Sequence, residues 1–376
     1  DVSFDFGNEL VAVFGPSGSG KSLTLQLIAG LLRPDFGRIV VDDEVLYENT
    51  GSGRTLFMPP NKRRIGFVFQ QPTLFPHLTV GQNIAYGHSG HREEIEELLD
   101  RFRLSRLECR YPSQLSLGQQ QRVAIARALA VKPKLLLLDE PFSAMDSLVR
   151  EKLRRDLRKS QRELKIPMIF VTHDLSEALT MADKMVILNN GSVLQLGAPR
   201  DIYNYPCSRT AARFVGMRNI FEGKVLVKDQ NSNSLIIASE GFNVVIPYRP
   251  LEIGKAVTWG IRSENIMIVH ERKLLKPSYQ ENIYEGTVVG IESKGMFFTL
   301  FVKVASANYD FEVFVFDHAF RALGIGIGQK IRIAFDKSKI RLLETSEDIA
   351  SISAPARDLS REALDVNAGG FAQSQG

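Results

Sequence analysis

The first part of the chain alternates between short apolar runs and longer amphipathic stretches. Three runs, at Leu10–Phe14, 135–138 and 168–171, are too short for helices and too uniformly apolar for half-exposed strands. Such runs are typical of buried strands in a mostly parallel sheet. Helical periodicity from Leu23 to Leu32 and a charge-laced stretch over 148–164, which we read as a solvent-facing helix, lie between them. The pattern predicts an α/β fold.

A hairpin is predicted at the end of this part. Apolar runs at 185–188 and 193–196 flank Asn189-Asn190-Gly191, and Asn-Gly favours the tight turn that joins two antiparallel strands. From about 218 to 345 the pattern changes to short strands separated by Gly, Pro and Asn turns. We therefore place a domain boundary at 217, between an α/β domain (1–217) and an all-β domain (218–345).

The second part contains an internal repeat. The segment Asn-Ile-Phe-Glu-Gly-Lys-Val at 219–225 returns 63 positions later as Asn-Ile-Tyr-Glu-Gly-Thr-Val at 282–288. The closing strands match at an offset of 74, so the second copy is longer in its middle. We predict two small all-β units, about 218–270 and 281–345, each closed on itself. Apolar periodicity fades after 345, and we expect 346–376 to be a disordered tail.

Composition adds mainly exclusions. Lys+Arg 47 against Asp+Glu 43 gives a net charge of +4, so nothing indicates a nucleic-acid partner. The two cysteines, Cys109 and Cys207, are too few for a disulfide scaffold and favour a reducing compartment. No run approaches the roughly 18 apolar residues of a membrane span, and we see no export signal at the start. The chain opens on Asp1, so residues of the natural protein are expected to precede it.

The strongest chemical signal is a phosphate-binding loop of the form G-x-x-x-x-G-K-S between the Leu10–Phe14 strand and the following helix. Its glycines let backbone N–H groups converge on phosphate oxygens. We expect Lys21 to reach the β- and γ-phosphates of a nucleotide and Ser22 to bind Mg²⁺. The predicted nucleotide-binding residues here are Gly15, Pro16, Ser17, Gly18, Ser19, Gly20, Lys21 and Ser22.

A second signal is the apolar strand at 135–138, which ends in Asp139 and Glu140. This pattern is typical of a Walker B strand. We expect Asp139 to hold Mg²⁺ and Glu140 to polarise the water that attacks the γ-phosphorus. On its own, such a strand is frequently structural; its pairing with the phosphate-binding loop favours the catalytic interpretation.

The sequence Leu-Ser-Leu-Gly-Gln at 115–119 distinguishes this chain from other nucleotide hydrolases. It resembles the signature of the ATP-binding-cassette (ABC) family, Leu-Ser-Gly-Gly-Gln, with Leu117 in place of the first glycine. The resemblance implies that Ser116, Gly118 and Gln119 cap the nucleotide phosphate. The alternative is a plain capping box at a helix start, for which Ser116 and Gln119 have the right spacing.

Three further residues match the family in order and spacing. Gln70 corresponds to the glutamine that contacts Mg²⁺ and the attacking water, Asp146 to an aspartate at the dimer interface, and His173 to the histidine at the γ-phosphate. The family's adenine-stacking aromatic would lie before the first residue of this chain. The implied fold is an α/β P-loop NTPase followed by duplicated small OB-like barrels.

The resemblance also implies partners. One chain carries one loop and one signature, so two chains packed head to tail would complete two ATP sites in a homodimer. The segment 74–80 and the repeated β domain look like the ATP-binding subunits of bacterial solute importers, and the TOBE/Mop-like second part is closest to those for molybdate or tungstate. This implies Mg²⁺-dependent ATP hydrolysis, a membrane permease, a solute-binding protein acting through it, and a peripheral position on the cytoplasmic face of the membrane.

Other functions stay open at this point. The same architecture serves importers of sulfate, ferric iron, sugar or polyamine, and the second part could bind an oxyanion or act only as a scaffold. An oxyanion-sensing or storage protein would not need the ATPase. A chromosome-maintenance ABC protein would need a long insertion, but only 94 positions separate Ser22 from Ser116, and a ribosome-associated ABC factor would carry two cassettes.

Overall fold

The computed structural model describes residues 1–343 except 52, 54, 144, 230–232, 271–273, 305, 306 and 308. The predicted tail, 346–376, lies outside the described residues. The chain divides into two compact units, Asp1–Gly216 and Met217–Gly376. Within the described part, no helix has the length and apolar character that crossing a membrane requires.

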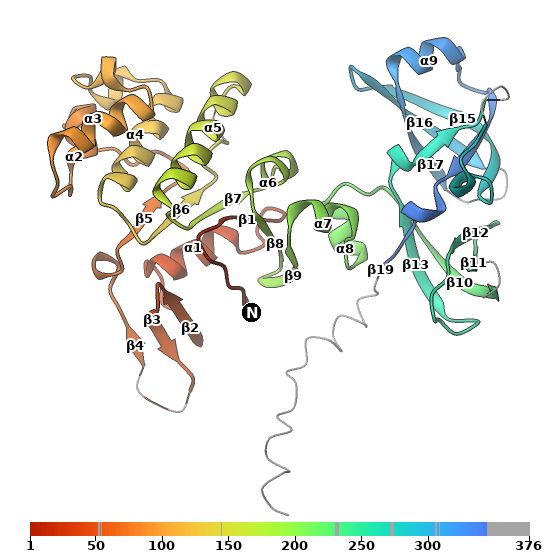
Figure 1. Ribbon diagram of the computed structural model, residues 1–376, viewed down its shortest axis with the longest axis horizontal. Helices are drawn as coiled ribbons and strands as arrows, with labels where there is room; N and C mark the ends of the chain where they lie inside the picture. Colours follow the sequence, from red (N-terminus) through yellow and green to blue (C-terminus); the bar gives the residue numbers. More distant parts are fainter. Residues whose placement is uncertain are drawn as a thin grey trace, which may run out of the picture. The chain divides into compact units, whose positions relative to one another are not determined.

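The first unit is built on a six-stranded sheet in the order β5-β6-β7-β1-β8-β9 (Figure 1). All pairs are parallel except β8–β9, the hairpin predicted from Asn189-Asn190-Gly191, and Asn190 and Gly191 have the positive φ values of 48° and 75° that such a turn needs. The α/β prediction is confirmed. The strands are β1 (Leu10–Phe14), β5 (Ile65–Val68), β6 (Leu135–Asp139), β7 (Met168–Thr172), β8 (Lys184–Asn189) and β9 (Ser192–Gly197).

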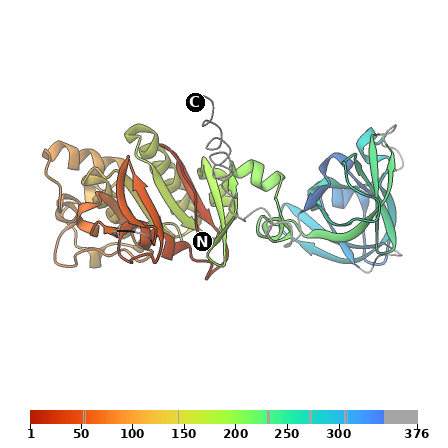
Figure 2. The same cartoon turned by 90° about the horizontal axis from the view of Figure 1, so that it is seen from below.

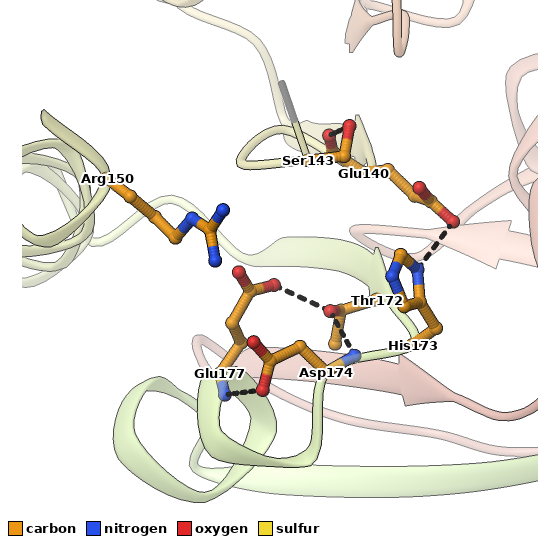
Figure 3. Close-up of a pocket in the computed structure, with 7 residues that line it drawn as sticks. All are labelled: Glu140, Ser143, Arg150, Thr172, His173, Asp174 and Glu177. Carbon is orange, nitrogen blue, oxygen red and sulfur yellow. Dashed lines mark hydrogen bonds and ion pairs between the residues drawn. The ribbon is translucent and has the colours of Figure 1, made fainter. Parts of the chain in front are cut away.

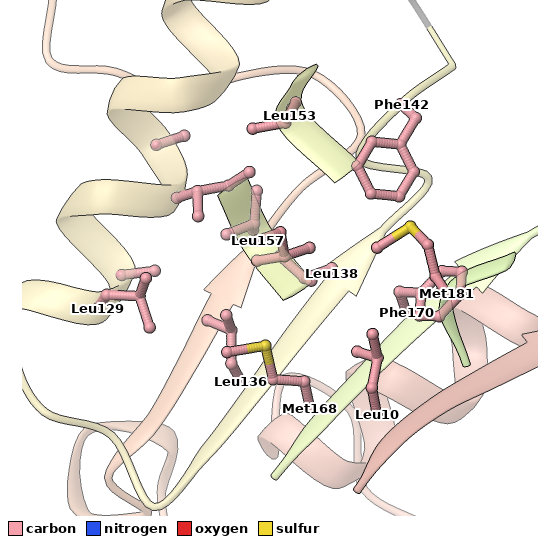
Figure 4. Close-up of a cluster of buried hydrophobic side chains, with 14 of the residues drawn as sticks. Leu10, Leu129, Leu136, Leu138, Phe142, Leu153, Leu157, Met168, Phe170 and Met181 are labelled. Carbon is pink, nitrogen blue, oxygen red and sulfur yellow. The ribbon is translucent and has the colours of Figure 1, made fainter. Parts of the chain in front are cut away.

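Helices cover both faces of this sheet. Alternate residues of β1 face opposite cores: Leu10, Ala12 and Phe14 pack with the residues of α4, α5 and α6, whereas Val11 and Val13 pack against α1. Figure 4 shows the first of these cores, where leucines of α5 lie over β6. The helices are α1 (Lys21–Ala29), α4 (Leu117–Ala130), α5 (Ser147–Leu164) and α6 (Leu175–Met181).

Two helices begin or end at residues other than those predicted from the sequence. The first was expected to run to Leu32 but stops at Ala29, because Gly30 adopts a left-handed conformation (φ 77°) and its N–H bonds back to the helix. The charged helix begins at Ser147, one residue before the predicted start. The other elements of this unit are β2 (Gly37–Val41), β3 (Glu44–Asn49), β4 (Leu56–Phe57), α2 (Val80–Ala85), α3 (Arg92–Arg101), α7 (Pro199–Asn204) and α8 (Arg209–Phe214).

The second unit contains two five-stranded antiparallel sheets, β12-β11-β10-β13-β19 and β14-β18-β15-β16-β17. Figure 2 shows their strands wrapping around a shared interior, and one hydrophobic core runs through both. The strands and one helix are β10 (Asn219–Asp229), β11 (Ser234–Ser239), β12 (Phe242–Pro247), β13 (Ala256–Ile261), β14 (Ile266–Ile268), β15 (Ile283–Ser293), β16 (Phe297–Val304), β17 (Asp310–Phe316), α9 (Asp317–Leu323), β18 (Lys330–Phe335) and β19 (Arg341–Leu343).

The all-β prediction for the second part is confirmed, but the repeats are not closed on themselves. The last strand of the first repeat, β14, pairs with β18 of the second, and the last strand of the second repeat, β19, pairs with β13 of the first. Each repeat thus completes the sheet of the other. The prediction of separate units was wrong because a repeat in sequence does not say which copy a terminal strand joins.

The asparagine that opens each repeat reinforces this exchange. The side chain of Asn219 accepts from the backbone N–H of Glu312 at 2.8 Å and donates to its carbonyl at 2.9 Å, on edge strand β17 of the other sheet. Asn282 makes the same pair with Val245 on edge strand β12, at 2.7 and 2.8 Å. Both side chains are buried. Each asparagine therefore satisfies part of an otherwise open strand edge.

We predict that Asn282→Ala lowers the free energy of unfolding of the second unit by about 2 kcal/mol, because it leaves the partly buried backbone N–H and C=O of Val245 without their partner. Denaturant titration followed by the fluorescence of Trp259, which is buried in this unit's core, measures the effect. The control is Asn243→Ala, whose side chain is exposed. Equal midpoints for the two variants would contradict the structural role of Asn282.

Candidate functional site

The phosphate-binding loop connects β1 to α1 and has the shape that its glycines allow. Gly20, just before α1, has φ 98°, a left-handed conformation that side chains disfavour. At Gly15, a Cβ would lie 2.2 Å from the backbone oxygen of Leu188 on β8. The loop therefore requires glycine at both positions, for backbone conformation at one and for space at the other.

Two buried polar groups of the loop point to a phosphate ligand. Lys21 donates to the carbonyls of Gly15 and Pro16 at 3.0 and 2.8 Å. Burial lowers the pKa of its ammonium, and the negative charges of Glu140 and Asp139 oppose this shift. Among the described residues, the buried hydroxyl of Ser19 has no hydrogen-bond partner. A buried ammonium and an unsatisfied hydroxyl on a helix N-terminus fit the oxygens of a nucleotide phosphate.

Ser22 and Asp139 meet as the sequence predicts for a Mg²⁺ site. The Ser22 hydroxyl donates to Oδ1 of Asp139 at 2.8 Å, although the two residues are 117 positions apart. Burial raises the pKa of the Asp139 carboxyl, and the Ser22 hydrogen bond partly offsets this. A hydroxyl and a carboxylate at this separation are hard oxygen ligands that fit Mg²⁺, which would complete its shell with phosphate and water oxygens.

Glu140 lies at the centre of the site. It follows β6 with φ 43°, a left-handed conformation that is uncommon for a residue with a side chain and is frequent at functional positions. Its carboxylate accepts from Nε2 of Gln70 at 3.3 Å and lies 3.2 Å from Nδ1 of His173, as Figure 3 shows for the histidine. The three residues come from the ends of β5, β6 and β7. The structure thus places Gln70 against Glu140 rather than against Ser22 and Asp139. The contact of Gln70 with Mg²⁺ stays a prediction.

The signature residues form a second group in the chain. Ser116 accepts from the Gln119 N–H at 3.4 Å, and Gln119 Oε1 accepts from the Ser116 N–H at 2.9 Å, so the capping box at the start of α4 is present. An oxygen that accepts in a cap can still donate its proton to a phosphate. A Cβ on Gly118 would lie 3.0 Å from Val149 of α5, which joins this helix start to the segment of Asp146.

Asp146 caps α5 by accepting from the Val149 N–H at 3.0 Å. Among the described residues, the capping hydrogen bonds of Ser116, Gln119 and Asp146 are made within the starts of α4 and α5, and none of them is to the phosphate-binding loop.

Leu117, which stands where the family signature has glycine, causes no steric conflict within the chain. Leu117 is the first residue of α4, has no positive φ that would demand glycine, and is 44% exposed.

A small pocket opens beside Glu140 and His173. The sequence singled out these two as site residues but not the rest of the lining, because Thr172 only follows the predicted strand 168–171 and the stretch 148–164, which contains Arg150, was interpreted as a solvent-facing helix. No motif spacing would have found them. Figure 3 shows the lining residues: Glu140, Ser143, Arg150, Thr172, His173, Asp174 and Glu177.

Comparison with known proteins agrees with this site. The model of a family described as ABC transporter matches residues 1–143. The chain is 46% identical over 230 residues to a sulfate/thiosulfate import ATP-binding protein of Thermosynechococcus vestitus, covering 59% of this chain and 66% of that protein. It is 46% identical over 226 residues to a spermidine/putrescine import ATP-binding protein of Clostridium acetobutylicum, covering 58% of this chain and 62% of the relative.

In both cases the match spans less than two thirds of the relative's length. A longer match, 39% identical over 288 residues, joins the chain to a spermidine/putrescine import ATP-binding protein of Ruegeria pomeroyi and covers 74% of this chain and 76% of that protein. It is too long to lie within the first unit alone. With its P-loop, Walker B strand and signature in one α/β unit, the chain belongs to the ATP-binding proteins of the ABC transporter family.

Proposed function

We propose that this chain is the ATP-hydrolysing subunit of an ABC importer. The observation that carries the proposal is the meeting of Gln70, Glu140 and His173 beside the phosphate-binding loop. In this proposal Lys21 and the backbone N–H groups of residues 17–20 would bind the β- and γ-phosphates, and Ser22 and Asp139 would hold Mg²⁺, which would supply positive charge to the phosphate oxygens.

The three residues around Glu140 have separate tasks. Glu140 accepts a proton from the attacking water, and Gln70 orients that water through its amide. His173 donates to a γ-phosphate oxygen and stabilises the charge that develops there. Its contact with Glu140 holds the base and the donor at the same end of the nucleotide. Steady-state hydrolysis of Mg²⁺-ATP by the purified chain tests the proposal: no turnover under any protein or nucleotide concentration would overturn it.

A head-to-tail homodimer follows from the separation of the two groups of site residues. In the part of the chain that the structure describes, Ser116 and Gln119 bond to each other, Gly118 approaches Val149 beside Asp146, and none of these contacts is to the phosphate-binding loop of the same chain. A second copy would bring its signature to the loop of the first, and the C₂ symmetry would make two equal sites. ATP would then favour the closed dimer, and hydrolysis would release it.

We predict that the specific ATPase rate rises with protein concentration. Two incomplete sites become complete only when chains associate, so the rate per chain should increase about linearly at concentrations far below the dimer dissociation constant and then level off. Rate measurements over a hundredfold dilution series at saturating ATP check this. A rate per chain that stays constant over the series would contradict composite sites.

The partners we propose are a membrane permease, which the dimer would contact on the cytoplasmic face, and a solute-binding protein that acts through the permease. Support comes from the relatives, which are named as import ATP-binding proteins. The chain would thus be peripheral to the membrane, with its conformational cycle coupled to that of another polypeptide.

For the solute we propose a tetrahedral oxyanion, with molybdate or tungstate first and sulfate next. The strand pattern at 286–293 resembles molybdate-type importers, and one relative is named for sulfate and thiosulfate. A polyamine is the second candidate, because the match that extends beyond the first unit is to a protein named for spermidine and putrescine. The second unit would then bind the anion as a regulator or serve as a scaffold.

Calorimetric titration of the full chain separates these candidates. Molybdate, tungstate, sulfate and spermidine are each titrated to excess over the protein in a buffer without Mg²⁺. Saturable heat with an oxyanion and none with spermidine is the expected result. Heat with spermidine alone would overturn the oxyanion assignment, and no heat with any solute would favour a scaffold role for the second unit.

A further inference from the structure

The imidazole of His173 has little around it to fix its position. Its side chain is 59% exposed, and Nδ1 lies 3.2 Å from Oε1 of Glu140. An exposed ring is not held by packing, so its direction must follow mainly from the backbone that carries it. The residues on either side of His173 are therefore where its position is determined.

The hydroxyl of Thr172 fixes both residues that flank His173, Thr172 itself and Asp174. Thr172, the last residue of β7, is 2% exposed. Its Oγ1 accepts from the backbone N–H of Asp174 at 3.0 Å and donates to Oε2 of Glu177 at 2.6 Å. The chain thus closes a short loop around His173, with a buried carboxylate as its anchor (Figure 3).

That carboxylate is neutralised by an arginine from another element. Glu177, in the first turn of α6, is 5% exposed, and its Oε1 accepts from a terminal nitrogen of Arg154 at 2.6 Å. Arg154 comes from α5 and is largely buried, with Oδ2 of Asp174 at 3.8 Å. A buried carboxylate without this cation would be strongly unfavourable, so the pair fixes α6 against α5.

Arg154 also reaches the segment that carries the base. Its guanidinium carbon lies 5.6 Å from the ring centre of Phe142, two residues after Glu140. Phe142 is fully buried in the core of the first unit (Figure 4). One side chain therefore contacts the segment of Glu140 on one side and, through Glu177 and Thr172, the segment of His173 on the other.

We propose that Thr172, Glu177 and Arg154 are positioning residues for ATP hydrolysis, which keep Nδ1 of His173 and the Glu140 carboxylate in register. The inference rests on the proposed function, because it assigns these residues a role in that reaction. They touch neither nucleotide nor water in this role and act only through His173 and Glu140.

Thr172→Val tests the role with little change of shape, since it removes only the hydroxyl that makes both hydrogen bonds. We expect kcat for ATP hydrolysis to fall about tenfold to a hundredfold, because small displacements of catalytic groups have effects of that size. KM for ATP should change less than about twofold, since the phosphate-binding loop is untouched. Thr172→Ser, which keeps the hydroxyl, should retain most of the parent kcat.

Arg154→Met tests the arginine that pairs with Glu177, and its neighbour Arg155 provides a matched control. Arg155 lies on the same helix, but its side chain is 70% exposed and pairs at the surface with Glu151 at 3.5 Å. We expect Arg154→Met to lower kcat as Thr172→Val does and Arg155→Met to leave it unchanged. Thermal melting shows whether Arg154→Met folds; if it does not, the threonine variants carry the test.

A double variant separates positioning from general damage. If Thr172 acts through His173, Thr172→Val should cause no further loss of kcat in a His173→Ala chain, so the two losses will not add. Losses that multiply would overturn the inference, as would a parent kcat in both Thr172→Val and Arg154→Met while His173→Ala is impaired. A parent rate in His173→Ala would instead refute the role of His173 in the proposed function, and the inference with it.

Discussion

Lys21→Ala is expected to weaken ATP binding by about a hundredfold and to bring hydrolysis below detection. The ammonium is buried, bridges the carbonyls of Gly15 and Pro16, and has the charge of a direct phosphate ligand. A charge-assisted hydrogen bond to phosphate contributes about 3 kcal/mol, which corresponds to about two powers of ten in affinity. The same change removes the cation that faces the carboxylates of Asp139 and Glu140.

Fluorescent ATP-analogue titration and a phosphate-release assay measure the two effects. Lys159→Ala is the matched control, because that side chain is 72% exposed on α5 and pairs at the surface with Glu163 at the long distance of 3.7 Å. Binding by Lys21→Ala within about threefold of the parent, with an unchanged melting curve, would show that the loop does not hold the phosphates through this residue.

The sequence predicts those parts of the site in which the functional residues are close together in the chain. The loop from Gly15 to Ser22 lies between one strand and one helix, so its shape follows from neighbouring residues. Asp139 and Glu140 are placed by the end of a strand, and the capping geometry of Ser116 and Gln119 by their spacing of three. In each case the backbone that positions the residue is adjacent in the chain.

Features that depend on pairing between residues far apart in the chain could not be predicted from the sequence. The exchange of β14 and β19 between the repeats depends on which of two similar sheets each strand joins. The Arg154–Glu177 ion pair joins two helices whose charged residues look alike in sequence, whether they face solvent or a buried partner. The meeting of Gln70 and His173 at Glu140 was expected only through the resemblance to a family, since the three residues are up to 103 positions apart.

Glu140→Gln is the second prediction with a large effect: kcat should fall about a hundredfold to a thousandfold while ATP binding is retained. An amide has nearly the shape of the carboxylate and can still contact Gln70 and His173, but it cannot take a proton from water, and a positioned general base contributes 10²- to 10⁴-fold. The loop, Lys21 and the Ser22–Asp139 pair are unchanged, so nucleotide affinity should stay within about threefold.

Because hydrolysis is what would open the ATP-bound dimer, Glu140→Gln should also accumulate as a dimer when ATP and Mg²⁺ are present, and the parent chain should not. Size-exclusion chromatography with and without ATP reports this, alongside single-turnover rates. Glu151→Gln, on an exposed side chain of α5, is the charge-matched control. Turnover at the parent rate would show that Glu140 is not the base, whereas a slow variant that remains monomeric with ATP would separate catalysis from dimerisation and would contradict the composite site.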